Sequence, residues 1–181
     1  MDPVSTQWRS HRVSIGLRSI ALVASLAGII AFAYSQDLHD RGVVLTEDLG
    51  HHIVTPSTGT IEYSFIWSLI ILSIELSNPL DLHPSLYVAF DFLAWAAVTV
   101  GLCLYLAIME PYYTGDGYTC GRGYRDCNGK RVANVEHFGT AMGFLAVVIH
   151  FGFFVWACSA ADKLRKSQHV SKKVAFANAA A

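Results

Sequence analysis

Four apolar stretches dominate this sequence, and each is long enough to cross a lipid bilayer as a helix. A transmembrane helix needs about 20 mostly apolar residues. None of the stretches alternates polar and apolar residues, as a membrane β-strand would. Because lipid offers backbone polar groups no partners, the sequence predicts an all-α fold, a four-helix transmembrane bundle. The predicted spans are residues 15–34, 61–78, 85–109 and 135–161.

The composition agrees with a membrane protein and excludes several other classes. Apolar residues make up 53% of the chain and charged residues only 15%, whereas soluble proteins carry about 25% charged residues. The same numbers exclude a disordered chain. The net charge is −1, and the chain therefore lacks the basic excess that a nucleic-acid partner would require.

The distribution of lysine and arginine predicts that both termini are cytosolic. Eight of these residues lie on the terminal side of the spans and five on the side of the two long loops, and cytosolic segments carry the excess. We expect a multi-pass protein of the plasma membrane or a secretory-pathway membrane. The predicted segments are a tail over 1–14, a four-span domain over 15–161, outer loops over 35–60 and 110–134, and a basic tail over 162–181 that is disordered from 174 onwards.

A signal peptide is an alternative interpretation of the first span. Arg9, Arg12 and Arg18 precede the apolar run, and Ala31 and Ala33 form an A-x-A pattern with the residue between them. The apolar run of 20 residues is long for a signal peptide, and cleavage would leave an odd number of spans. We therefore expect a retained helix.

Two cysteines in the second outer loop predict a disulfide. Cys120 and Cys127 are separated by a segment that contains two glycines, which allow the sharp fold that so short a ring needs. An exported loop meets an oxidising compartment. A metal pair is the alternative, but no second pair with zinc-site spacing accompanies it.

The other two cysteines lie within or beside predicted spans. Cys103 lies in the middle of the third span, where a small core residue is the simplest interpretation. Cys158 lies beside the basic tail, in a position that suits S-palmitoylation. An unmodified buried or lipid-facing thiol is the alternative for Cys158.

Three charged residues lie within the spans near the terminal side: Arg18, Glu75 and Asp91. A charge at mid-depth costs about 2.5–3.5 kcal/mol on insertion. We expect a buried cluster in which Arg18 pairs with Asp91 and Glu75 lies nearby. In the alternative, Arg18 and Glu75 reach the membrane interface separately. Apolar neighbours surround Asp91 and Glu75, which disfavours a proton relay or transport path.

The histidines do not predict a haem site. Only His137 and His150 fall within a span, and they are about 20 Å apart along one helix. We place His39 in a solvated acidic outer loop. The sequence contains no recognised catalytic motif, and we assign no catalytic residue, metal ligand or cofactor.

Two features of the fourth span and its tail concern packing and lipid contact. Gly139 and Gly143 form a G-x-x-x-G motif, which lets helix backbones approach closely. Packing within the bundle is favoured over an oligomer interface. Five basic residues follow the span, and they either contact anionic lipid or are ordinary positive-inside charges: Lys163, Arg165, Lys166, Lys172 and Lys173.

The layout resembles fungal-type MARVEL-domain membrane proteins, a four-span family linked to membrane apposition and specialised membrane patches. The resemblance covers about residues 12–161. It rests on Arg18 at the start of the first span, Asp91 and Trp95 in the third, the cysteine pair of the second outer loop, and an aromatic-rich fourth span. It implies a non-enzymatic role in organising membrane domains or in membrane traffic, with lipids, further copies or other membrane proteins as partners.

Other four-span classes fit less well. The first outer loop lacks the tryptophan and cysteines of claudin-like proteins, and the second is too short for a tetraspanin. A small membrane enzyme or accessory subunit acting on a hydrophobic metabolite remains the alternative. Such an enzyme would depend on Asp91, Glu75 or His150.

Overall fold

The computed structural model describes residues 3–41, 44–45, 55–77, 84–113, 119–120 and 128–179. Two short strands pair antiparallel, with Val44 opposite Cys120. The elements are α1 (Pro3–Asp40), β1 (Val44–Leu45), α2 (Thr55–Ser77), α3 (Pro84–Tyr113), β2 (Thr119–Cys120) and α4 (Gly129–Ala179).

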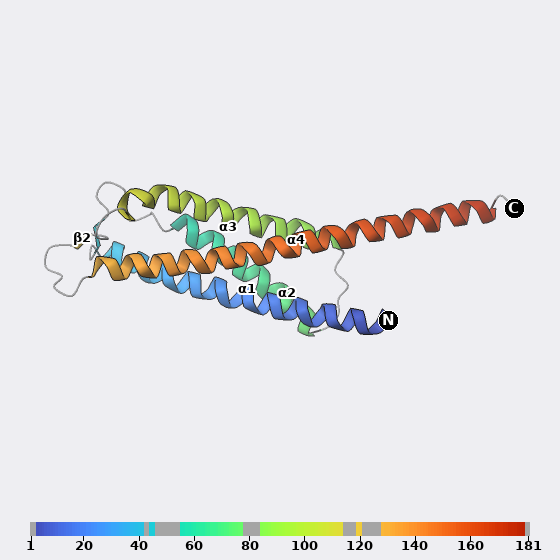
Figure 1. The fold of residues 1–181 in the computed structure, drawn as a ribbon, viewed down its shortest axis with the longest axis horizontal. Helices are drawn as coiled ribbons and strands as arrows, with labels where there is room; N and C mark the ends of the chain where they lie inside the picture. The colour runs from blue at the N-terminus through green and yellow to red at the C-terminus, as the bar shows by residue number, and fades with distance from the viewer. Residues whose placement is uncertain are drawn as a thin grey trace.

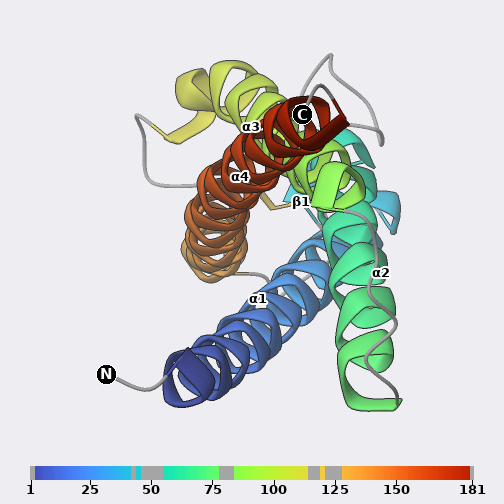
Figure 2. The same ribbon diagram turned by 90° about the vertical axis from the view of Figure 1, so that its right-hand side faces the viewer.

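The four helices form one elongated bundle. Helix α4 packs against α1 and α3, and α2 packs against the same two helices. Both ends of the chain lie at one end of the bundle, and the β1–β2 pair lies at the other (Figure 1). Figure 2 views the bundle from the end that holds the termini. We call these the terminal end and the loop end.

All four helices are long and apolar enough to cross a membrane, which confirms the predicted all-α bundle and indicates a multi-pass integral membrane protein. The candidate spans are Arg12–Asp40, Pro56–Ser77, Ser85–Ile108 and Gly129–Lys163. The first continues past residue 34, and the fourth starts before residue 135. Both extensions lie at the loop end, where polar side chains of α1 and α4 contact one another.

The C-terminal tail differs from its prediction. We expected a disordered segment from residue 174, but α4 continues to Ala179. The segment over 153–179 contains no glycine or proline, and its alanines and lysines favour helix. The helix therefore projects beyond the bundle at the terminal end (Figure 1).

The apolar core lies between all four helices. It contains Phe32 of α1, Ile61 of α2 and Leu102 of α3, all fully buried, together with Val147 of α4. The ring of Phe32 contacts that of Tyr105 at a centroid distance of 5.2 Å. Since dispersion gains depend on close contact, this cluster supplies much of the packing between the helices.

The two glycines of the G-x-x-x-G motif face this core. A Cβ on Gly139 would lie 3.2 Å from Ala31 Cβ, and one on Gly143 would lie 2.8 Å from Leu102 Cδ1. Both distances are shorter than ordinary van der Waals contacts. The motif therefore serves packing within the bundle, as the sequence analysis favoured.

Candidate functional site

Asp91 of α3 joins all four helices. Its carboxylate accepts two hydrogen bonds from Arg18 of α1, at 2.7 and 2.6 Å. The indole Nε1 of Trp67 on α2 donates to Oδ1 at 2.9 Å, and Nδ1 of His150 on α4 lies 3.1 Å from the same oxygen. We call these four residues the Asp91 cluster. A single buried carboxylate thus contacts each of the other three helices.

The charges of this cluster are compensated inside the bundle. Arg18 is 2% exposed and Asp91 is fully buried. Their two-point contact is the strong geometry for arginine and carboxylate. The guanidinium also lies 3.9 Å from the ring centroid of Phe153, close enough for a cation–π contact. These contacts offset the cost of removing both charges from water.

A chain of hydroxyl groups extends from the Asp91 cluster. Nε2 of His150 lies 2.8 Å from Ser64 Oγ, which in turn lies 3.1 Å from Ser25 Oγ. Because a carboxylate only accepts, Nδ1–H of His150 donates to Asp91, and in the neutral imidazole Nε2 accepts from the Ser64 hydroxyl. Ser64, His150 and Asp91 therefore stand in the order of a nucleophile, a base and an orienting carboxylate.

The sequence analysis expected the Arg18–Asp91 pair, and the structure contains it. Glu75 lies nearby but does not join the Asp91 cluster; it accepts a hydrogen bond from Ser14 Oγ at 3.0 Å. The sequence analysis did not connect Trp67 or His150 to Asp91. The available signal was the position of His150 within an otherwise apolar run of the fourth span.

A second carboxylate, Glu136 of α4, forms a similar cluster at the loop end. It accepts a hydrogen bond from Tyr105 OH of α3 at 2.8 Å. Ser35 Oγ of α1 also donates to it, and His39 Nε2 of α1 lies 3.2 Å from Oε1. We call these four residues the Glu136 cluster. It joins α1, α3 and α4.

The Glu136 cluster corrects the prediction for His39. We placed His39 in a solvated loop, but α1 continues through it and its side chain is 5% exposed. The helix persists because His39 and Ser35, one turn apart, both reach Glu136. Glu136 was not singled out from sequence, although it stands two residues before the uncharged run of the fourth span.

The two clusters lie in different halves of the bundle. Glu136 and His150 are both on α4, and the rise of 1.5 Å per residue places them about 21 Å apart along the axis. Among the described residues, no group of three or more histidine, cysteine or acidic side chains could hold a metal ion.

A cavity of about 240 Å³ opens beside the Asp91 cluster. Its wall includes residues near the ends of α2 and α3 at the terminal end. We call it the terminal cavity. Its lining residues are Ser14, Arg18, Glu75, Tyr87, Asp91, Phe153, Trp156, Ala157 and Ala160.

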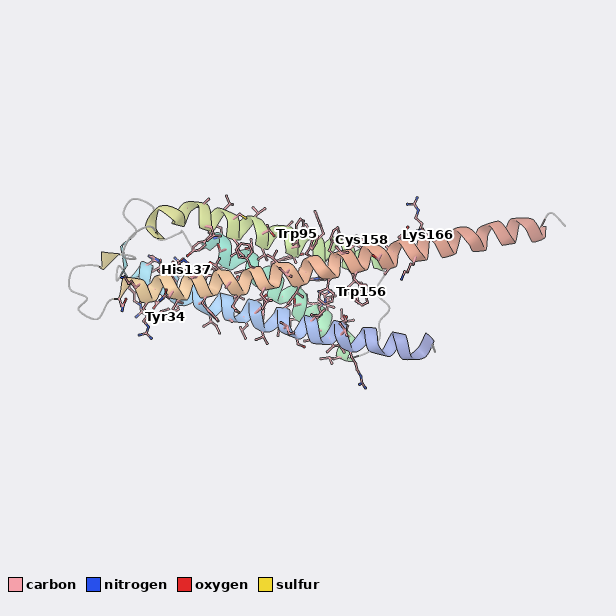
Figure 3. The ribbon with its side chains drawn as sticks, in the orientation of Figure 1. Tyr34, Trp95, His137, Trp156, Cys158 and Lys166 are labelled. Atoms are coloured by element: carbon pink, nitrogen blue, oxygen red, sulfur yellow. The ribbon has the colours of Figure 1, made fainter. Side chains whose placement is uncertain are left out.

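The remaining predicted residues lie outside these clusters. Lys163 and Arg165 are exposed, and Lys166 pairs with Asp162 of its own helix at 2.6 Å. Lys166 projects beyond the bundle, whereas Cys158 lies toward its terminal end and is half-buried (Figure 3). The side chains of Lys172 and Lys173 lie outside the described part of the chain.

The cysteine predictions have different outcomes. Cys103 is exposed on the outer surface of α3, and its interpretation as a core residue is therefore wrong. The buried side chains on this part of α3 are those of Leu102 and Tyr105. Cys127 lies outside the described residues, and the Cys120–Cys127 disulfide stays a prediction.

Comparison with known proteins adds no relative: no family model, no curated protein and no solved structure matches the chain.

Proposed function

We propose that this chain is a non-enzymatic membrane protein that organises membrane domains or membrane apposition, as its resemblance to fungal-type MARVEL-domain proteins implies. The observation that supports this most is the Asp91 cluster. Its carboxylate contacts the three other helices, and the Glu136 cluster adds contacts from α4 to α1 and α3. The intramembrane charges thus hold the four helices as one unit.

A rigid unit suits an organiser because its lipid-facing surface keeps one shape while lipids and neighbours exchange around it. That surface is apolar on all four helices. It includes Val23 and Ile30 of α1, Ile66 of α2, Val100 and Leu104 of α3, and Phe138 and Val148 of α4, all exposed. We propose that copies associate laterally through this surface.

The basic tail of α4 supplies the second part of the proposed mechanism. Each lysine or arginine near an anionic leaflet contributes about 1 kcal/mol of attraction. In the proposed orientation both termini are cytosolic, and the tail meets the anionic inner leaflet of a plasma or secretory-pathway membrane. The proposed Cys120–Cys127 disulfide would shape the loop on the opposite side.

Reconstitution into giant vesicles tests this proposal. Dye-labelled protein in vesicles of phosphatidylcholine with phosphatidylserine is followed by fluorescence correlation, which reports the brightness of each diffusing particle. We expect particles of several copies that enrich labelled phosphatidylserine. Particles with the brightness of one copy at every protein density would refute the organising role.

A tail variant separates the two parts of the mechanism. Replacing all five basic residues with glutamine should abolish the enrichment of phosphatidylserine and leave the clusters. Its matched control replaces Lys130 and Arg131, exposed at the loop end of the same helix, and should keep the enrichment. The five residues replaced in the tail variant are Lys163, Arg165, Lys166, Lys172 and Lys173.

One observation favours a second candidate, a membrane enzyme that transfers or hydrolyses acyl groups. Ser64, His150 and Asp91 form a relay with contacts of 2.8 and 3.1 Å, the arrangement that activates a serine nucleophile. Against it, Ser64 is fully buried and its hydroxyl also contacts Ser25. The terminal cavity is lined by Asp91 but not by Ser64 or His150.

A fluorophosphonate probe distinguishes the two candidates, because it labels activated serines covalently. The organising role predicts no labelling of Ser64 in the folded protein in bilayers. Labelling that disappears in Ser64→Ala but persists in Ser73→Ala would favour the enzyme. Ser73 is the matched control because it is exposed on the same helix and donates to the backbone oxygen of Leu69.

A further inference from the structure

The terminal cavity lies at the depth of the helix ends. Glu75 stands two residues before the end of α2, and Tyr87 three residues after the start of α3. At 1.5 Å per residue these are only about 3 and 5 Å from the helix ends. Trp156 lies toward the same end of the bundle (Figure 3). In a bilayer crossed by the four candidate spans, we therefore place the cavity near the level where phospholipid headgroups meet the hydrocarbon region.

The wall of the cavity is divided between apolar and charged side chains. Phe153, Trp156, Ala157 and Ala160 of α4 form an apolar side. Arg18, Asp91 and Glu75 contribute the charged groups from α1, α3 and α2. Such a division matches an amphipathic ligand, since orienting polar groups stand beside an apolar wall.

Two polar atoms of these lining side chains lack a hydrogen-bond partner among the described residues. One is Nε of Arg18, a donor whose terminal nitrogens already bind Asp91. The other is Oε2 of Glu75, an acceptor whose companion Oε1 is bound by Ser14. Both atoms are shielded from solvent, and an unsatisfied buried polar group costs about 1–3 kcal/mol.

The charges around these atoms have opposite signs. The Arg18 and Asp91 charges offset one another in their ion pair, and Glu75 adds a further carboxylate. The ring of Phe153 already faces the Arg18 guanidinium, and Phe153 and Trp156 otherwise form part of the apolar wall. A ligand that satisfies both unpartnered atoms needs an acceptor for Arg18 Nε and a donor for Glu75 Oε2. A positively charged donor makes the stronger hydrogen bond to a carboxylate.

We infer that the terminal cavity binds the headgroup of a zwitterionic phospholipid whose ammonium group carries N–H donors. The ammonium group binds Glu75 Oε2, the phosphate accepts from Arg18 Nε, and the start of the acyl region lies against Phe153 and Trp156. At about 240 Å³ the cavity is smaller than pockets for drug-sized ligands, which start at about 300 Å³. It therefore holds a headgroup and not a whole lipid.

This site does not depend on the proposed organising role, because a bundle that never clusters could still hold one lipid. The two proposals also fail separately. Clustering is measured by particle brightness in vesicles, whereas the lipid site is measured by which lipid stays bound to a single bundle.

Native mass spectrometry of delipidated protein in mild detergent tests the inference. The protein is mixed with equal amounts of three dioleoyl lipids: phosphatidylethanolamine, anionic phosphatidylglycerol and a singly charged trimethylammonium lipid. Because the acyl chains are identical, retention reports the headgroup. We expect one bound phosphatidylethanolamine, retained about tenfold over either singly charged lipid, as one charge-assisted hydrogen bond predicts.

Two variants and their controls complete the test. Glu75→Gln removes the charge and should abolish the preference, whereas Glu62→Gln, exposed on the same helix, should keep it. Ala160→Leu fills the cavity without changing any charge and should expel the lipid. Ala161→Leu, which does not line the cavity, should not expel it.

Several outcomes would overturn the site. Equal or stronger retention of phosphatidylglycerol or of the trimethylammonium lipid by the unaltered protein would show that the site does not require a headgroup with both charges. A preference for phosphatidylethanolamine that survives Glu75→Gln or Ala160→Leu would place the lipid elsewhere. Melting temperatures of all four variants identify any that fail to fold, and the cavity-filling variant tests the site without altering the ion pairs.

Discussion

His150 and Asp91 contact one another through Nδ1 and Oδ1 at 3.1 Å, and this contact joins α4 to α3 inside the bundle. The same oxygen accepts from Trp67 of α2, while Arg18 of α1 binds both carboxylate oxygens. One side chain of α3 therefore contacts each of the other three helices. Since a buried charge without its partners is costly, changes at Asp91 should affect the whole bundle.

Asp91→Asn should lower the stability of the bundle markedly. The substitution leaves the Arg18 charge buried without its counter-ion, and breaking a buried ion pair costs about 3–5 kcal/mol. Thermal unfolding in detergent, followed by circular dichroism, measures the effect. The control Asp162→Asn removes the exposed pair with Lys166 and should change stability by less than about 1 kcal/mol. Equal melting temperatures for Asp91→Asn and the unaltered protein would contradict this account.

His150→Phe should also destabilise the bundle, by about 1–3 kcal/mol, because it removes the buried contacts of His150 with Ser64 and with Asp91. His137→Phe on the same helix is the matched control, since the His137 side chain is exposed. Urea or sodium dodecyl sulfate titration of both variants provides the measurement. Comparable losses at the two positions would argue against the buried relay.

Tyr105→Phe tests the Glu136 cluster. It removes a single hydroxyl that donates to Glu136 at 2.8 Å and keeps the ring contact with Phe32. A hydrogen bond to a charged group contributes about 1.5–3 kcal/mol. We expect a loss of about 2 kcal/mol in the same unfolding assay, against almost none for Tyr34→Phe, whose side chain is 45% exposed. If Tyr105→Phe left the free energy of unfolding unchanged, the hydroxyl would not stabilise the cluster.

Gly143→Leu should disrupt packing between the helices. A Cβ at this position would already lie 2.8 Å from Leu102 Cδ1, and overpacking a core costs about 1–3 kcal/mol. Gly152→Leu on the same helix is the control, because nothing lies within 4 Å of its Cβ position. If Gly152→Leu proved the more damaging variant, the face assigned to packing would be wrong.

Thiol counting tests the predicted disulfide. The chain has four cysteines, and Cys103 and Cys158 are free. Under denaturing conditions without reductant, we expect maleimide to label two thiols, and four after reduction. Four labelled thiols before reduction would exclude the Cys120–Cys127 bond.

The sequence was sufficient to determine the all-α class and the number of spans. Length and apolar composition alone decide these properties in lipid, because a spanning segment must satisfy its backbone hydrogen bonds within itself. It also identified the Arg18–Asp91 pair, since charges inside apolar spans are costly and rare. The sequence favoured an internal role for Gly139 and Gly143 over an oligomer interface, and their close approach to Ala31 and Leu102 in the structure decided it.

Only the tertiary structure decided which polar groups meet. The positions of Trp67 and His150 around Asp91 depend on how each helix is rotated, which local composition does not specify. His39 and Glu136 lie 97 residues apart. In the sequence alone, each lies near the edge of a predicted span, and nothing there indicates its partner. Burial of these side chains becomes favourable only when partners arrive from other helices, because a lone polar group in the membrane interior has no compensating hydrogen bond.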